Sequence, residues 1–148
     1  MVKTSMDSLI AEVAGETNHK LLASWAADCA ERVLPCFEEE YPEDNRPRKA
    51  IEELRIWIKS GVFKMADVRG ASLAAHAAAR EVEEGDPGHS AARAAGQAMA
   101  VAHVPAHAIA AAIYAATAVR DSANQDEAEA AALKERQWQY QHLLEIQA

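Results

Sequence analysis

Two lines of polar side chains lie inside an alanine-rich stretch that runs from residue 68 to residue 119. Their members are four residues apart: Ser72, His76 and Arg80 in the first line, with Arg69 beside it, and His89, Arg93 and Gln97 in the second. Residues at this spacing share one face of a helix. Because buried charge is costly without a partner, these side chains either face solvent or form a polar seam where two antiparallel helices meet. Such a seam would be a structural network or a small-molecule or metal pocket.

His103 and His107 are also four residues apart, which on one helix supplies half of a metal site. Pro105 lies between them, and the sequence specifies no third ligand. A histidine satisfied in the core or at a helix end is the commoner arrangement. We therefore predict no metal and no cofactor.

Asp28 and Arg32 can pair along one helix face, either on the surface or partly buried beside Trp25. We predict that these two residues, together with His76 and Arg80, are largely buried and linked by hydrogen bonds.

Acidic residues gather in two short segments, which are candidates for binding a partner: Glu38, Glu39, Glu40, Glu43 and Asp44 in the first, and Glu83, Glu84 and Asp86, with Glu81, in the second. Arg46 and Arg48 lie at a predicted helix start, where cations oppose the helix dipole. We expect them to pair with carboxylates such as Asp44 or Asp28. The alternative for both acidic segments is simple solvation.

Composition limits the class of protein. The chain has 148 residues and a formal net charge of -8, and 35 residues are alanine. Net negative charge disfavours nucleic acid or an anionic membrane as partner. Residues 98–119 are interrupted by His103, Pro105 and His107, so we predict no transmembrane helix.

Cys29 and Cys36 are about 10 Å apart on one helix, too far for a disulfide. We expect buried, reduced thiols, no signal peptide and a cytoplasmic protein.

Helical periodicity dominates the chain, and no stretch alternates like a strand. We predict an all-α, single-domain antiparallel bundle of about six or seven helices. Residues 1–16 form an N-terminal segment, 17–121 the helical core, and 122–148 a last helix packed on the core or on a partner subunit. Thr17 is the predicted N-cap of a helix over residues 18–40, Gly61 and Gly85 end two helices, and Asp86-Pro87 begins another.

An ordered series of segments resembles an immunity protein family associated with bacterial polymorphic toxin systems. The series covers roughly residues 21–118 and consists of residues 24–35 (SWAADCAERVLP), Arg46-Pro47-Arg48, Ala50-Ile51, Trp57, Val68-Arg69, 75–80 (AHAAAR), 91–97 (AARAAGQ), Ala102-His103, His107-Ala108, Ala111-Ala112 and Tyr114-Ala115. The resemblance implies an all-α protein without catalytic activity that neutralises a toxin encoded nearby.

The polar residues that match this series are expected to form one convergent network or pocket: Asp28, Arg32, Arg46, Arg48, Trp57, Arg69, His76, Arg80, His103, His107 and Tyr114. We predict a non-catalytic protein that binds and occludes a protein toxin, with the acidic surface steering a basic partner. We expect a monomer or homodimer. The alternative is a small-molecule- or metal-binding helical protein or enzyme that uses the arginine and histidine network. A purely structural helical module also remains open.

Overall fold

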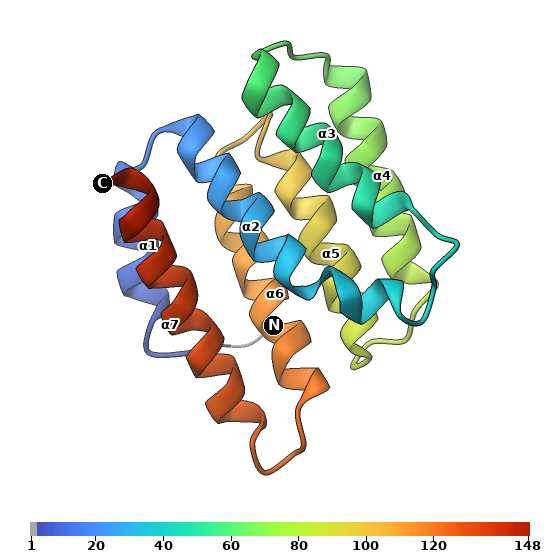
Figure 1. Cartoon of the computed structure of the whole chain (residues 1–148), viewed down its shortest axis with the longest axis vertical. Helices are drawn as coiled ribbons and strands as arrows, with labels where there is room; N and C mark the ends of the chain where they lie inside the picture. The colour runs from blue at the N-terminus through green and yellow to red at the C-terminus, as the bar shows by residue number, and fades with distance from the viewer. Residues whose placement is uncertain (1–2) are drawn as a thin grey trace.

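Alanine has the highest helix propensity of any residue, and the alanine-rich chain is helical along most of its length. The computed structural model describes residues 3–148, and regular structure in that range consists of seven helices and no strand. The helices are α1 (Asp7–Glu16), α2 (His19–Glu38), α3 (Arg46–Ser60), α4 (Met65–Arg80), α5 (Pro87–Ala100), α6 (His107–Ser122) and α7 (Ala128–Gln147) (Figure 1). The predicted all-α bundle is confirmed. Met1 and Val2, the start of the predicted N-terminal segment, lie outside the described residues.

Local capping chemistry sets several helix ends where the sequence places them. The Asp86 side chain accepts a hydrogen bond from the backbone N–H of Gly88 at 2.8 Å, and Pro87 occupies the first turn of α5. Gly61 ends α3 with a φ of 71°, a left-handed conformation that costs glycine little. The N-cap of α2 is Asn18 and not Thr17, because the Asn18 side-chain Oδ1 accepts the Leu21 N–H at 2.9 Å.

Three further helix ends can be compared with the sequence, and that of α4, which was expected at Gly85, departs most from it. Pro35 lies inside α2, which continues to Glu38, because a proline close to a helix end removes only one hydrogen bond. Helix α4 ends at Arg80, and the acidic residues up to Glu84 form the turn that leads to α5. Residues 101–106, with Pro105, separate α5 from α6, so His103 and His107 do not share a helix.

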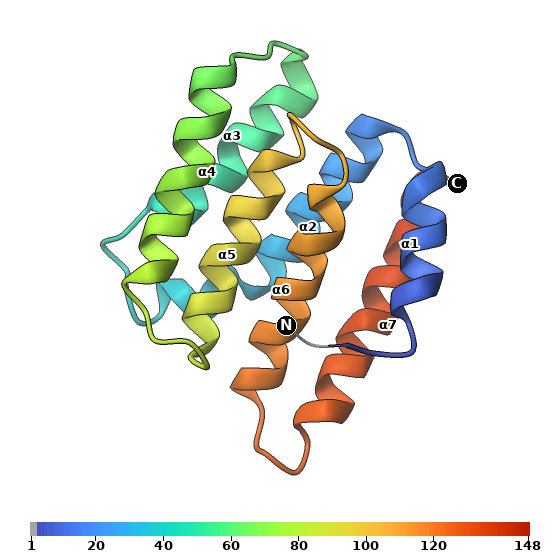
Figure 2. The ribbon, with the colours of Figure 1, turned by 180° about the vertical axis from the view of Figure 1, so that it is seen from behind.

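Helix α5 is the centre of the bundle and contacts α2, α3, α4 and α6 (Figures 1 and 2). Its buried residues are glycine, serine and alanine, apart from Met99. Small side chains allow neighbouring backbones to approach closely, so α5 can be surrounded by four helices. Its outward face, which carries His89, Arg93 and Gln97, remains partly exposed between α4 and α6.

Helix α7 packs on α1, α2 and α6 of the same chain and brings a buried arginine into the core. The Arg136 side chain is 0% exposed, and its guanidinium donates to Gln139 Oε1 and to Asp7 Oδ1, each at 2.8 Å. Gln139 Nε2 donates to the Ala112 carbonyl, and the Trp25 indole N–H donates to the Gln139 carbonyl. These bonds tie α1, α2 and α6 to α7.

We predict that Arg136→Ala lowers the free energy of unfolding by about 3–5 kcal/mol, because it breaks a buried charged pair and leaves a cavity. Arg136→Met fills most of that volume but leaves Gln139 Oε1 unpaired, so we expect a smaller loss of about 1–3 kcal/mol. Urea denaturation, compared as midpoints at constant slope, measures both. A loss below about 1 kcal/mol for the alanine variant would contradict the burial of this charge.

Candidate functional site

Polar side chains from α4, α5 and α6 meet on the outward face of α5. We define the α5 seam as Ser72 and His76 of α4, Arg93 and Gln97 of α5, and His107 of α6. Arg93 Nη1 donates to His76 Nδ1 at 2.9 Å, and Ser72 Oγ donates to the Gly96 carbonyl at 2.8 Å. His107 Nδ1 lies 2.8 Å from Gln97 Oε1 and donates to it. The two polar lines seen in the sequence thus face each other across α4 and α5.

His76 sits deep in the seam because α5 carries glycine at the contact. A Cβ atom at position 96 would lie 2.7 Å from His76 Nε2, so any larger residue would displace the imidazole. Burial lowers the pKa of His76 to about 4, and the positive charges of Arg93, Arg80 and His107 add to the effect. A neutral imidazole also agrees with the geometry, because Nδ1 must be unprotonated to accept from Arg93.

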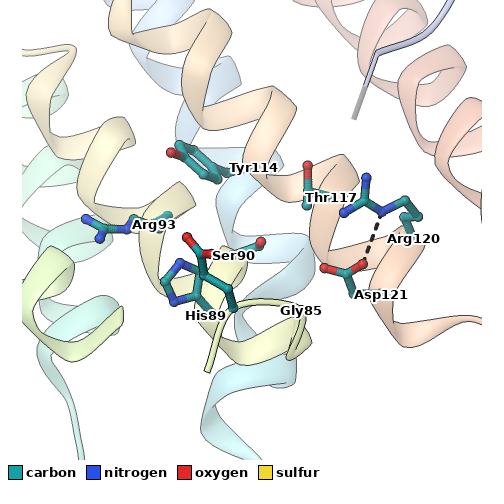
Figure 3. A pocket seen from close by; sticks show the side chains of 9 residues that line it. Gly85, His89, Ser90, Arg93, Tyr114, Thr117, Arg120 and Asp121 are labelled. Carbon is teal, nitrogen blue, oxygen red and sulfur yellow. Dashed lines mark hydrogen bonds and ion pairs between the residues drawn. The ribbon is translucent and has the colours of Figure 1, made fainter. Parts of the chain in front are cut away.

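Two cavities lie at the two ends of the α5 seam. The polar cavity, of about 320 Å³, is lined by Glu84, Gly85, His89, Ser90, Arg93, Tyr114, Thr117, Arg120 and Asp121 (Figure 3). The apolar cavity, of about 200 Å³, is lined by Met65, Val68, Arg69, Ser72, Leu73, Ala100, His103 and His107. Arginine and histidine side chains therefore border cavities on this face of the bundle.

The predicted network from Asp28 to His107 is not continuous. Asp28 binds Arg55 at 2.9 Å and His142 at 2.7 Å, on the α2, α3 and α7 side. Arg32 forms a two-pronged ion pair with Glu135, at 2.8 and 2.9 Å, and lies over the Trp138 ring. No hydrogen bond links either residue to the α5 seam in the described part of the chain.

The position of Arg80 contradicts the predicted buried network most clearly. It lies at the exposed end of α4, so the expected burial of Asp28, Arg32, His76 and Arg80 in one linked network is wrong. The reason is geometric. The outer face of α5 lies against α4 and α6, whereas Asp28 and Arg32 point toward α3 and α7. Trp57 also lies apart from the seam, where its ring contacts His19.

Arg46 and Arg48 lie among the acidic residues at one end of the bundle. Arg46 pairs with Asp44 and with Glu81, and Arg48 pairs with Glu38. The expected pairing of Arg46 with Asp44 is confirmed, and neither arginine pairs with Asp28. The bridge from Asp44 to Glu81 through Arg46 brings the two acidic segments together.

His103 and His107 do not share a helix face, because α5 ends before His103. His103 is exposed and stacks on Phe63, whereas His107 bonds to Gln97. Among residues 3–148, no three histidine, cysteine or carboxylate side chains are grouped closely enough to hold a metal ion. Cys29 and Cys36 are both free, and only Cys29 is fully buried.

The sequence analysis missed the polar residues of the last helix that fix its position. Glu135, Arg136 and Gln139 are buried, although their types predict exposure. One sequence signal could have revealed this burial. Ala132, Arg136, Gln139 and Leu143 follow one another at helical spacing, so the two polar residues share the apolar face of α7. None of the helices in the described range is both long and apolar enough to cross a membrane.

Comparison with known proteins identifies the family. The family model described as Imm-5 like putative immunity protein matches residues 12–146. The chain belongs to this family. No curated protein and no solved structure matches it. The match extends the resemblance seen in the sequence through α7, so it includes the buried Arg136.

In this Imm-5-like protein we predict that Gly96→Ala ejects His76 from the seam and raises the pKa of His76 from about 4 toward its usual 6.5. The matched control is Gly70→Ala in α4, where an added Cβ meets nothing within 4 Å. The control should stabilise the protein by about 0.5–1 kcal/mol without moving His76. NMR titration of the imidazole measures the pKa, and an unchanged value in Gly96→Ala would contradict the packing.

We also predict that stability falls as the pH is lowered from 6.5, because the pKa of His76 is about 4 in the folded chain and 6.5 in the unfolded chain. The unfolded state binds the proton first, so its population rises in this window. His76→Gln keeps a hydrogen-bond acceptor for Arg93 but does not titrate. Its free energy of unfolding should vary less between pH 6.5 and about 5, above most carboxylate titrations. Equal slopes would refute the assignment.

Proposed function

We propose that this Imm-5-like protein binds a cognate protein toxin and neutralises it by covering its surface, without catalysing a reaction on it. The family description supports an immunity role. We define the acidic end as residues 38–44 together with residues 81–86. The acidic end is the surface on which a basic partner docks.

The main support is that the two acidic segments form one surface. Glu40 and Asp86 come from different turns, and their contact raises the pKa of Glu40. Arg46 and Arg48 neutralise Glu38, Asp44 and Glu81. No ion pair in the described chain neutralises the rest: Glu39, Glu40, Glu43, Glu83, Glu84 and Asp86.

Crowded carboxylates favour a cationic partner for two physical reasons. In the free protein the negatively charged carboxylates repel one another, which raises its free energy. A basic surface that binds there offsets this repulsion with attraction. Their combined field also accelerates encounter with a positively charged protein. A toxin held in this way would be blocked by steric cover alone.

We predict that the double variant Glu39→Lys, Glu43→Lys slows association with the toxin encoded beside this chain by about tenfold or more at low salt. The matched control is Glu12→Lys, Glu16→Lys on α1, which changes net charge equally on another exposed surface. Biolayer interferometry at several salt concentrations measures the rates. Equal slowing by both variants, or no toxin binding by the native protein, would refute the proposal.

The non-catalytic part has its own test. Toxin recovered from the complex by denaturation should have an unchanged mass and regain its activity. A mass change that requires the immunity protein would instead identify an enzyme.

A further inference from the structure

Three arginines lack a carboxylate partner, and all of them lie on α4 and α5. Six of the chain's nine arginines form ion pairs: Arg32, Arg46, Arg48, Arg55, Arg120 and Arg136. Arg69, Arg80 and Arg93 form none in residues 3–148. In a chain with 23 acidic residues this local excess of positive charge is unusual, and it borders the α5 seam.

Arg93 has unused binding capacity beside the polar cavity. A guanidinium carries five N–H donors, and within residues 3–148 that of Arg93 forms one hydrogen bond, to His76. That bond fixes the side chain in position at the cavity wall. Burial and nearby positive charge keep His76 neutral, so it orients Arg93 without cancelling its charge.

The polar cavity has ends of different chemistry (Figure 3). Arg93 and Tyr114 lie on one side, and the Arg120–Asp121 pair lies on the other. Glu84 adds a second carboxylate to the lining, and the Ser90 hydroxyl lies between the two sides. The Arg93 side therefore favours an anionic group. On the other side Arg120 donates to Asp121 Oδ1, and the second carboxylate oxygen of Asp121 favours hydrogen-bond donors.

We propose that the polar cavity binds a small molecule with a carboxylate or phosphate at one end and hydroxyl or ammonium groups at the other. Arg93 and Tyr114 hold the anionic group, and Glu84 and Asp121 accept from the donors. The volume of about 320 Å³ suits a metabolite. An extended acidic peptide fits less well, because the same two carboxylates would repel it.

This site is distinct in chemistry from the acidic end, although Glu84 borders both. The polar cavity takes a small molecule through its anionic group, whereas the acidic end takes a basic protein surface. Ligand binding in the polar cavity is tested on the protein alone, without a toxin, so its outcome is separate from that of the toxin-binding experiment.

Three probes test the site in the full chain: inorganic phosphate, glycerol 3-phosphate and L-serine. The first isolates the anionic group, and the other two distinguish a phosphate from a carboxylate ligand with donors attached. NMR follows the Arg93 guanidinium, the Tyr114 ring and the His76 imidazole. We expect saturable shifts at Arg93 and Tyr114 with at least one probe, and a rise in the pKa of His76 when that probe is bound.

Arg93→Gln should weaken binding by about tenfold or more, because it removes charged hydrogen bonds to the anion. Tyr114→Phe, which deletes one hydroxyl and keeps the ring, should weaken binding several-fold. It tests the same site if Arg93→Gln does not fold. Arg55→Gln is the matched control, since it removes the same charge on the other side of the bundle. Absence of saturable shifts with all three probes would overturn the proposal, as would equal weakening by Arg93→Gln and Arg55→Gln.

Discussion

The close approach of α5 to four neighbouring helices is the constraint on which the rest of this structure depends. It requires residues without bulky side chains, and α5 supplies alanine, glycine and serine at nearly every buried position. Close packing has a cost, because small residues bury little apolar area each. The larger residues that complete the core come from other helices, such as Trp25, Phe37 and Leu54. Alanine brings the backbones together, and larger aromatic and aliphatic residues of the other helices fill the core around them.

The same packing decides where polar groups lie. A helix surrounded on most sides has one narrow outward face, and long side chains on that face must extend between its neighbours. Arg93 and His76 meet in this way over Gly96. Positive charge therefore accumulates along α4 and α5, whereas the turns at one end of the bundle collect carboxylates such as Glu40 and Asp86. A chain with net negative charge thus keeps three arginines without an ion pair in residues 3–148 on two of its helices, apart from the crowded carboxylates.

Sequence patterns predicted the helices and their chemistry better than the contacts between helices. Asp86-Pro87 and Gly61 act within one or two residues, so their roles could be inferred from the sequence. The partners of Asp28 and Arg32 lie on α3 and α7, and nothing in local spacing identifies them. The meeting of His76 with Arg93 was predictable because adjacent antiparallel helices place two short polar lines face to face. The break between α5 and α6 was harder to predict, since Pro105 permits either a kink or a new helix.

Arg136 shows why the final helix escaped prediction and what it contributes. Its Nε atom is the single buried side-chain polar atom in the described residues without a hydrogen-bond partner. An apolar side chain there would avoid that cost, but it would leave Gln139 Oε1 without its Arg136 donor. Its bonds to Asp7 and Gln139 do, however, fix the register of α7 against α1, which apolar contacts alone would leave free to slide. The family match includes this helix. We therefore infer that Arg136 specifies one docked position of α7.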